Sequence, residues 1–387
     1  MPEAITKPLR IALFTGNYDY IKDGVSLTLN RLVAYLEKNN IPVLIFAPTA
    51  KVPAFESVGE VISVPSFAIP FRSEYRLARG LPTSARSRIA AFEPTLFHVA
   101  SPDALGFQAL KFAQAKKIPV VATFHTRYDT YLKFYGVGFL ANMMLAYFRK
   151  FYARCNRVFP PSQSMVDALV AEGFKNNMEV FGRGVDSDLF TPARRSLEWR
   201  HKLGVADDEV VVSFVSRLVK EKNTDLMIRC FQRLHSVGVK FRILIVGLGP
   251  EERTLRAALP DAIFAGFLTG TELARAYASS DIFFFPSESE TFGNVTLEAI
   301  ACGLPAVVAD ATGSRSIVED GKNGFVQNAH DEHGFDRHLK ALIEDQALRL
   351  TMSKAARKRS LEFNWDAILE KLVASFRAVS DQHYNPS

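Results

Sequence analysis

Short apolar runs alternate with amphipathic stretches along the whole chain, in two successive sets. Between the apolar runs, apolar residues recur with helical spacing, for example from Ser26 to Lys38 and from Asp225 to Ser236. Short buried strands that alternate with helices indicate parallel sheets covered on both faces. We therefore predict an α/β protein with two Rossmann-like domains, whose parallel sheets face each other across an interdomain cleft.

The two sets also predict the domain boundaries. The first domain is expected at residues 1–190, a polar linker at 191–204 and the second domain at 205–365. The predicted strands of the first domain lie near residues 10–15, 42–47, 95–99, 119–124, 157–160 and 178–182, and those of the second near 210–215, 241–246, 262–265, 281–285, 305–309 and 324–326.

Two glutamates, Glu290 and Glu298, lie in a segment predicted as strand, polar loop and helix. Backbone N–H groups at a helix entrance bind phosphate, and Gly293 leaves room for an anion to approach. Carboxylates accept hydrogen bonds from hydroxyls, which sugars have in abundance. The segment therefore suits a nucleotide diphosphate joined to a sugar. The alternative is a pair of solvated surface charges.

Two cations follow another predicted strand. Arg217 and Lys222 come directly after the apolar run 210–215. In open parallel sheets, ligands bind at the carboxyl ends of the strands, and two fixed cations there can neutralise a leaving diphosphate. The alternative is a solvated charged loop. The prediction requires these cations and the acidic loop near residue 290 to converge on one pyrophosphate pocket between the two domains.

Taken together, these motifs resemble those of the retaining glycosyltransferases of family 4, which have the GT-B fold. Arg217 and Lys222 match the family's Arg…Lys pair, and Glu290 with Glu298 matches its E-x7-E element. Three further segments agree: residues 23–25 resemble the glycine loop, residues 119–126 the strand that carries the active-site histidine, and residues 181–186 the entry to the linker. The resemblance covers nearly the whole chain, and it implies a final helix, at about 366–387, that crosses back onto the first domain.

The resemblance implies a role for each matched residue. Glu290 is expected to hold hydroxyls of the donor sugar, Glu298 to hold the ribose, and His125 to lie by the anomeric carbon. Arg217 and Lys222 are expected to stabilise the diphosphate, and together with His125 and Glu290 they form the predicted catalytic set. The other residues expected to bind the donor are Gly24, Val25, Leu268, Phe292, Gly293, Asn294 and Val295.

The expected reaction is retaining transfer of a hexosyl or uronosyl group from a nucleotide diphosphate sugar, with UDP favoured over GDP. The resemblance implies front-face attack, in which the leaving phosphate takes the acceptor proton, and it implies no metal or other cofactor. Residues 122–136 and 182–186 are most similar to the branch that glycosylates membrane lipids, such as sulfoquinovosyl- and mannosyl-diacylglycerol synthases. The acceptor, a lipid or a glycan, is expected to contact Arg127, Tyr128, Tyr131 and Arg183.

Other function classes stay open at this point. A GT-B sugar-nucleotide epimerase or phosphorylase would share the motifs, and a non-catalytic peripheral membrane protein would share the basic charge. A nicotinamide enzyme is disfavoured, because Glu252 stands where the glycine pattern that begins at Gly247 needs its third glycine. Asp186 and Asp188 have the spacing of a metal-binding D-x-D motif, but they lie in the segment already matched to the linker, so no metal is assigned to them.

The net charge of +6 over 387 residues has its basic excess in residues 1–190, which hold 22 Lys and Arg against 15 Asp and Glu. Within the stretch 139–154, a large apolar surface is combined with Arg149, Lys150 and Arg154. This pattern is typical of a helix at an anionic membrane surface, although a helix packed inside the domain with a basic rim would show it too. No nucleic-acid motif accompanies the charge, so nucleic acid is not an expected partner.

The sequence also predicts a location. The first residues contain no apolar signal region, and no apolar run approaches the ~18 residues that span a bilayer. We therefore expect a cytoplasmic protein, peripheral on the inner face of the cell membrane if its acceptor is a lipid. Cys155, Cys230 and Cys302 are expected to be reduced core thiols, because they are odd in number and widely spaced.

Overall fold

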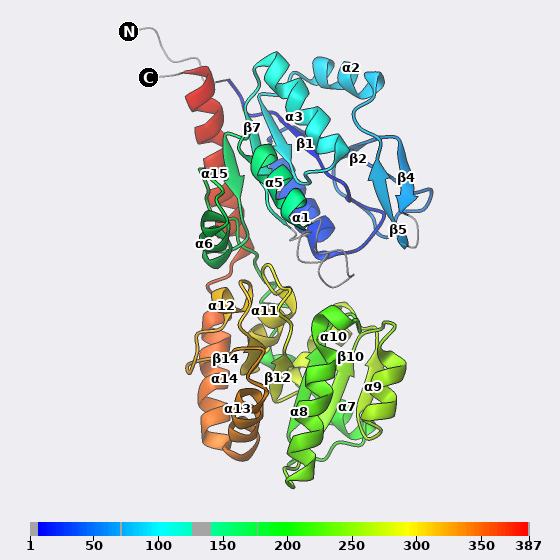
Figure 1. Ribbon diagram of the computed structural model, residues 1–387, viewed down its shortest axis with the longest axis vertical. Coiled ribbons are helices and arrows are strands. Elements are labelled where there is room, and N and C mark those ends of the chain that lie inside the picture. The colour runs from blue at the N-terminus through cyan, green and yellow to red at the C-terminus, as the bar shows by residue number, and fades with distance from the viewer. Residues whose placement is uncertain (1–6, 70–71, 126–140, 176, 386–387) are drawn as a thin grey trace. The chain divides into compact units, whose positions relative to one another are not determined.

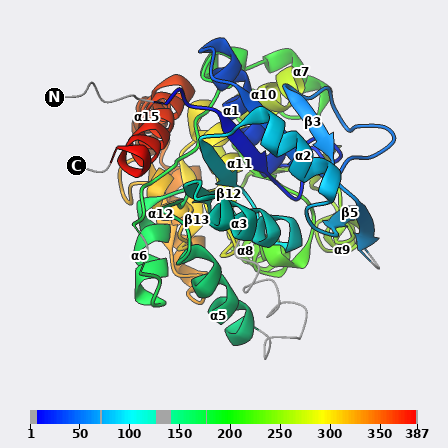
Figure 2. The same ribbon diagram turned by 90° about the horizontal axis from the view of Figure 1, so that it is seen from above.

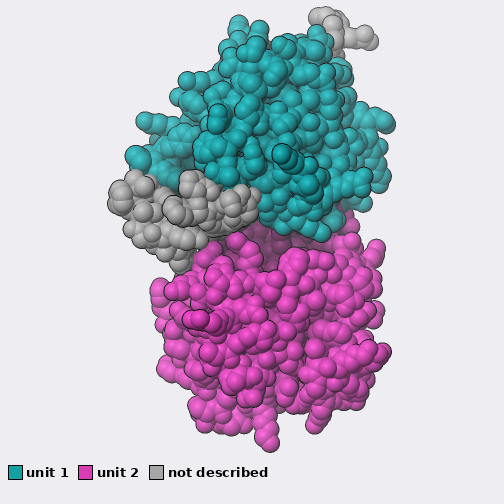
Figure 3. Space-filling model, turned by 90° about the vertical axis from the view of Figure 1, so that its right-hand side faces the viewer, with its two compact units in different colours: residues 1–182, 366–387 teal, residues 183–365 magenta. Residues whose placement is uncertain are grey.

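The computed structural model describes residues 7–69, 72–125, 141–175 and 177–385. The chain divides into two compact units (Figure 3): unit 1 contains Met1–Gly182 and Asp366–Ser387, and unit 2 contains Arg183–Trp365. In each unit, helices flank a central sheet (Figure 1). The predicted α/β class with two parallel-sheet domains is therefore confirmed.

The described residues of unit 1 form a parallel six-stranded sheet in the order β3-β2-β1-β6-β7-β8. Every residue of β1, β6 and β7 is buried, as expected for central strands covered on both faces. The strands are β1 (Ile11–Phe14), β2 (Val43–Ala47), β3 (Glu60–Ser63), β6 (Leu96–Val99), β7 (Val120–Thr123) and β8 (Arg157–Phe159), and the helices are α1 (Gly24–Lys38), α2 (Thr83–Phe92), α3 (Ala104–Lys116), α5 (Ala141–Tyr152), α6 (Gln163–Ala171) and α15 (Trp365–Tyr384).

The apolar pattern predicts most of these strands, with two differences. Residues 178–182 were expected to form a strand, but the structure shows only an isolated bridge between Val158 and Met178. The pattern also gives no sign of β3 or of the antiparallel pair β4 (Ser66–Ile69) and β5 (Arg72–Ala78). These short strands mix polar and apolar residues without a regular pattern and lie partly exposed, so they contain no apolar run as long as those of the central strands.

The described residues of unit 2 form a second parallel sheet, in the order β11-β10-β9-β12-β13-β14. Its strands are β9 (Val211–Val215), β10 (Arg242–Val246), β11 (Ile263–Gly266), β12 (Ile282–Phe285), β13 (Ala306–Ala309) and β14 (Gly324–Gln327). The helical segments are η2 (Pro192–Arg194), α7 (Leu197–Lys202), η3 (Lys220–Lys222), α8 (Thr224–Ser236), α9 (Glu252–Ala258), α10 (Gly270–Ala278), α11 (Asn294–Ala301), α12 (Ser314–Ile317), α13 (Glu332–Glu344) and α14 (Gln346–Ser360).

Residues 183–204, which the sequence divides between the first domain and a linker, belong to unit 2 in the structure. Phe190 is buried and packs edge-on against Tyr277. Arg357 donates to the carbonyl oxygens of Ser187 and Phe190, and Arg200, almost fully buried, pairs with Asp281 at 3.0 Å. These contacts make the segment part of the second core.

Helix α15 (Figure 1; Figure 2) belongs to unit 1 except for its first residue, Trp365, which is the last residue of unit 2. The ring of Phe376 packs against His98 and Phe159, at centroid distances of 5.3 and 5.5 Å. The hydroxyl of Ser375 lies 2.6 Å from Oε2 of Glu179 and accepts from Arg157. The end of the chain therefore covers one face of the sheet that its beginning forms.

Helix α5 contains the stretch expected either to lie on a membrane or to pack inside the domain. Phe148, Phe151 and Tyr152 are buried in the core of unit 1, so most of the apolar surface is used internally. Met143 and Tyr147 remain exposed on the other side, at 67% and 37%. Among the described residues, no helix has the length and hydropathy needed to cross a membrane. Cys155, Cys230 and Cys302 are free and buried, which agrees with the predicted core thiols.

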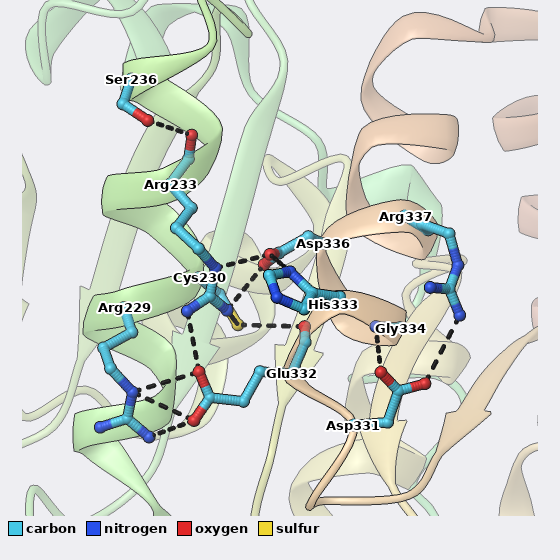
Figure 4. A network of polar contacts seen from close by, with 10 residues as sticks. All are labelled: Arg229, Cys230, Arg233, Ser236, Asp331, Glu332, His333, Gly334, Asp336 and Arg337. Carbon is cyan, nitrogen blue, oxygen red and sulfur yellow. Dashed lines mark hydrogen bonds and ion pairs between the residues drawn. The ribbon is translucent and has the colours of Figure 1, made fainter.

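An ion network joins α8 to α13 in unit 2 (Figure 4). Glu332 accepts from Arg229 at 2.5 Å and from Arg233 at 2.8 Å, and Arg233 also pairs with Asp336 at 2.6 Å. The hydrogen bond from Arg229 is the main cause that lowers the pKa of Glu332 to about 2. The network fixes the register between two helices that cover the sheet, and it lies outside the site described below.

Candidate donor site of unit 2

The strand order of unit 2 reverses between β9 and β12, which lie side by side although β10 and β11 separate them in the sequence. In open parallel sheets, the loops that leave the carboxyl ends of the strands diverge at such a point and form a ligand-binding crevice. The loop after β9 contains Arg217 and Lys222, and the loop after β12 contains Glu290. The topology therefore brings the two predicted motifs to one edge of one sheet.

Lys222 and Glu290 meet at this edge. The Nζ of Lys222 donates to Oε1 of Glu290 at 2.5 Å, and both side chains are mostly buried, with exposures of 11% and 16%. The hydroxyl of Ser287 donates to the same Oε1 at 3.2 Å. Since buried charges are stable only when paired or hydrogen-bonded, the two loops hold each other in place through this contact.

Arg217 lies at the same edge but is exposed, and its side chain has no hydrogen bond or ion pair with the described residues. Its loop rests on the glycine turn after β10. The N–H of Leu218 donates to the carbonyl oxygen of Leu248, and a Cβ on Gly247 would lie 1.8 Å from the carbonyl oxygen of Ser216. Gly247 and Gly249, set aside above as a dinucleotide fingerprint, therefore support the loop that carries Arg217.

Helix α11 begins at Asn294, one short turn after Glu290, and has no side-chain N-cap. Gly293, at its N-cap position, has φ +95°, a conformation that glycine adopts without strain. The Thr312 hydroxyl and the Gly313 N–H both donate to the Glu290 carbonyl oxygen at 3.0 Å, and a Cβ on Gly313 would lie 2.4 Å from the Phe292 backbone. Thr312 and Gly313 thus hold the predicted turn from Phe292 to Val295 in place. The turn presents the N-terminus of α11 beside the Lys222–Glu290 pair.

Glu298 lies one turn further along α11 and has a different partner. Its Oε2 accepts from the Tyr277 hydroxyl at 3.3 Å. Burial raises the pKa of the Glu298 carboxyl to about 7, and the Tyr277 hydrogen bond opposes that shift. The structure therefore pairs Glu290 with a cation and places Glu298 in a neutral, less polar environment, so the two glutamates are not equivalent.

This raised pKa predicts a pH-dependent stability. As pH rises from about 4.5 to about 7, the unfolded chain ionises at Glu298 before the folded protein does, so the wild type loses stability over this window. The Glu298→Gln variant stays neutral and is expected to gain about 2 kcal/mol over the wild type at pH 8, and nothing at pH 4. Chemical denaturation at both pH values measures the difference.

The exposed Glu288→Gln change is the matched control, because it alters a carboxylate of the same loop region that solvent reaches. The difference in free energy of unfolding between this variant and the wild type should be the same at pH 4 and pH 8. An equal effect of Glu298→Gln at pH 4 and pH 8 would show that Glu298 is ionised normally in the folded protein.

Leu268 follows β11 at the same edge of the sheet. It is partly buried against the core of unit 2, whereas the neighbouring Phe267 is 69% exposed. The predicted contact of Leu268 with the donor would thus come from its backbone, beside an aromatic ring that faces solvent.

Gly24 and Val25 lie in unit 1, at the start of α1. The side chain of Asp23 caps this helix: it accepts from the N–H groups of Val25 at 3.0 Å and Ser26 at 2.9 Å. The Val25 N–H is therefore already taken by a carboxylate, which disfavours its predicted contact with a diphosphate. Sequence reasoning missed this cap, although Asp23 and Ser26 have the spacing of a capping box.

His125 also lies in unit 1, directly after β7, and is buried. Its Nε2 lies 2.8 Å from the hydroxyl of Thr123. Arg183, predicted to contact the acceptor, is a buried residue of unit 2, and burial lowers the pKa of its guanidinium to about 10. The other predicted acceptor residues, Arg127, Tyr128 and Tyr131, lie outside the described residues.

Comparison with known proteins identifies the family and the fold. Residues 22–189 match the model of Glycosyltransferase Family 4, and residues 196–359 match that of Glycosyl transferases group 1. Among solved structures, the fold is similar to sucrose-phosphate synthase from Thermosynechococcus elongatus, with TM-score 0.80, 20% identity and coverage of 96% of this chain and 99% of the other. The Anabaena protein HepE in complex with UDP has TM-score 0.76 and 20% identity, with coverage of 96% and 100%. These likenesses define the fold as GT-B.

Proteins with similar sequences show which family of GT-B proteins this chain belongs to. Sulfoquinovosyl transferase SQD2 of Arabidopsis thaliana is 33% identical over 96% of this chain and 74% of its own length. A GDP-mannose-dependent alpha-mannosyltransferase of Corynebacterium glutamicum is 31% identical, with coverage of 97% and 90%, and the alpha-monoglucosyldiacylglycerol synthase of Acholeplasma laidlawii is 25% identical, with coverage of 90% and 92%. The chain belongs to the family 4 glycosyltransferases.

Proposed function

We propose that this protein is a retaining glycosyltransferase whose nucleotide sugar donor binds at the carboxyl edge of the unit 2 sheet. One observation carries the proposal: the buried Lys222–Glu290 pair lies beside the uncapped entrance of α11, at the point where the strand order reverses. A cation and a helix N-terminus at one edge both suit the negatively charged diphosphate of a donor. The carboxylate beside them suits the donor's sugar, which is rich in hydroxyls.

The proposed chemistry assigns each group a task. Breaking the bond between the anomeric carbon and the diphosphate builds negative charge on the leaving group, which Lys222, Arg217 and the N–H groups at the start of α11 would stabilise. Glu290 would accept from a sugar hydroxyl while Lys222 holds the phosphate, and Glu298 would accept from the ribose. These fixed groups supply the charge stabilisation for which other transferases use a metal, so we propose transfer without one. The leaving phosphate would take the acceptor proton.

We favour UDP as the nucleotide and a membrane lipid as the acceptor. The GT-B structure of HepE contains UDP, whereas three relatives at 30–31% identity are named for GDP-mannose, so UDP and GDP are the two nucleotides to compare. A diacylglycerol acceptor is suggested by the name of the Acholeplasma relative. The exposed Met143 and Tyr147 of α5, with Lys150 beside them, would suit contact with an anionic membrane surface on the cytoplasmic side.

The test is thermal unfolding in the presence of UDP, GDP and their hexose derivatives, followed by incubation with the best donor. A ligand at ~100 times its Kd adds about 2.7 kcal/mol of stability, so one base should raise the midpoint clearly. Donor plus lipid vesicles should then give a glycolipid with the anomeric configuration of the donor.

The controls separate the competing classes. Donor alone that yields an epimer indicates an epimerase, and donor plus inorganic phosphate that yields a sugar phosphate indicates a phosphorylase. If no nucleotide shifts the midpoint while vesicles are bound, the protein is a membrane-binding module and the transferase proposal fails.

A further inference from the structure

Behind His125, a line of polar groups runs into the core of unit 1. The hydroxyl of Thr123 lies 2.8 Å from Nε2 of His125 and 3.2 Å from Nε2 of His98. Thr123 is 1% exposed and His98 0%. A single hydroxyl therefore joins an internal histidine to the histidine predicted to lie by the anomeric carbon.

The strand pattern explains this arrangement. Side chains alternate between the two faces of a sheet, so His98 on β6 and Thr123 on β7 point away from the face that Phe97, Val99, Val120 and Ala122 form with the main core cluster. On their own face, the Phe376 ring of α15 lies against His98 at 5.3 Å. The polar line is thus enclosed between the sheet and the last helix.

The number of donors and acceptors available determines which atom donates in each of these hydrogen bonds. Among the described residues, Nδ1 of His98 is buried and has no partner. A neutral imidazole has one donor nitrogen and one acceptor nitrogen, and a buried N–H without an acceptor is rarer and costlier than a buried lone pair without a donor. His98 should therefore carry its proton on Nε2, where the Thr123 hydroxyl can accept it. Burial lowers the pKa of His98 to about 3, which agrees with a neutral ring.

A hydroxyl has one proton to donate. Since the Thr123 oxygen accepts from His98, its own proton is directed to the other nitrogen within reach, Nε2 of His125. We infer that His98 is a positioning residue, which acts through Thr123 to hold His125 as the neutral tautomer with Nε2 as acceptor and the proton on Nδ1. Nδ1–H is then the group through which this ring donates a hydrogen bond to an oxygen.

The inference concerns the ring itself, and only its consequence for catalysis rests on the proposed function. If His125 lies by the anomeric carbon, the Nδ1–H tautomer can donate to a hydroxyl of donor or acceptor. An Nε2–H tautomer would instead donate its hydrogen bond to the Thr123 hydroxyl. His98 thus determines which nitrogen of His125 carries the proton.

The tautomer can be read directly by NMR on the full-length protein labelled with 15N-histidine, without any substrate. Signals of His125 are assigned with a His125→Phe variant. In the wild type, His125 should show a protonated Nδ1 and an unprotonated Nε2. Thr123→Val removes the hydroxyl at nearly constant shape and should convert His125 to a mixture of tautomers, whereas Thr123→Ser should preserve the wild-type pattern.

His98→Phe removes the first donor but keeps an aromatic ring against Phe376, and it should also give the mixture. Ser380→Ala deletes another buried hydroxyl of unit 1, one without a partner among the described residues, and should leave His125 unchanged. A wild-type His125 with its proton on Nε2 would overturn the inference even if no variant folds. So would an unchanged pattern in folded His98→Phe protein.

Transfer assays give the second readout. Thr123→Val should lower kcat about 10-fold, the value of one hydrogen bond in the transition state, and leave the KM for the donor nearly unchanged. Thr123→Ser should restore kcat. Because the NMR result needs no activity, a correct tautomer in a protein that transfers nothing would disprove the proposed function and leave the positioning role of His98 intact.

Discussion

Replacing Lys222 with methionine is expected to lower kcat/KM by about 10²–10³, the usual effect of losing one preorganised group that stabilises a leaving charge. Methionine keeps most of the length of the side chain, so the change removes the cation that pairs with Glu290 while it preserves the packing. The affinity for the free nucleotide diphosphate should fall as well. Steady-state kinetics and calorimetric titration with UDP or GDP measure the two effects.

Lys220→Met is the matched control, because Lys220 lies in the same short helix, η3, but is exposed. It should retain full activity. The Lys222 variant leaves a buried carboxylate without its cation, so its midpoint of thermal unfolding must be compared with that of Lys222→Met/Glu290→Gln. A well-folded Lys222→Met protein with activity within threefold of the wild type would contradict the proposed role.

Gly247→Ala is expected to destabilise the protein by about 3 kcal/mol or more and to abolish donor binding. Its φ of +135° is strained for any residue with a Cβ, and that Cβ would lie 1.8 Å from the carbonyl oxygen of Ser216. The loop that carries Arg217 would have to move away from the edge of the sheet. Denaturant unfolding gives the first effect, and titration with the nucleotide diphosphate gives the second.

Gly238→Ala separates strain from collision. Gly238 also has a positive φ, +83°, but a Cβ there would meet nothing within 4 Å. It follows α8, away from the strand ends that carry the site. This variant should lose only about 1 kcal/mol and bind the donor normally. Equal losses in the two variants would mean that the Ser216 loop is not supported by Gly247.

The fold could be predicted from the sequence wherever strands are buried on both faces. Strand β12 consists of apolar residues throughout and β9 of apolar residues except the buried Ser213, because helices cover both sides of the sheet. The pair β4 and β5 contains polar and charged residues and lies partly exposed, so it carries no such signal. The segment 183–204 shows a different limit: it looks polar, yet Arg200 is buried because its guanidinium finds Asp281 and three carbonyl oxygens.

For the candidate site, residue types and spacing were enough to bring Lys222 to Glu290, since both follow strands that end at the same edge. Spacing could not show that Glu298 bonds to Tyr277 and has a raised pKa, because Tyr277 comes from a different helix. Likewise, nothing in the neighbourhood of His125 in the sequence points to His98, which reaches Thr123 only through the pairing of β6 with β7.

The division of the chain into units has a practical consequence for dissecting the enzyme. Unit 2 is one uninterrupted stretch, Arg183–Trp365, and contains Lys222, Glu290 and Glu298 together, whereas unit 1 needs pieces from both ends of the polypeptide. A fragment that stops at residue 182 would leave His98 and Phe159 without the Phe376 ring that covers them. Unit 2 is therefore the easier of the two to express separately. A truncation or fusion at the carboxyl terminus instead perturbs unit 1, most of which is synthesised first on the ribosome.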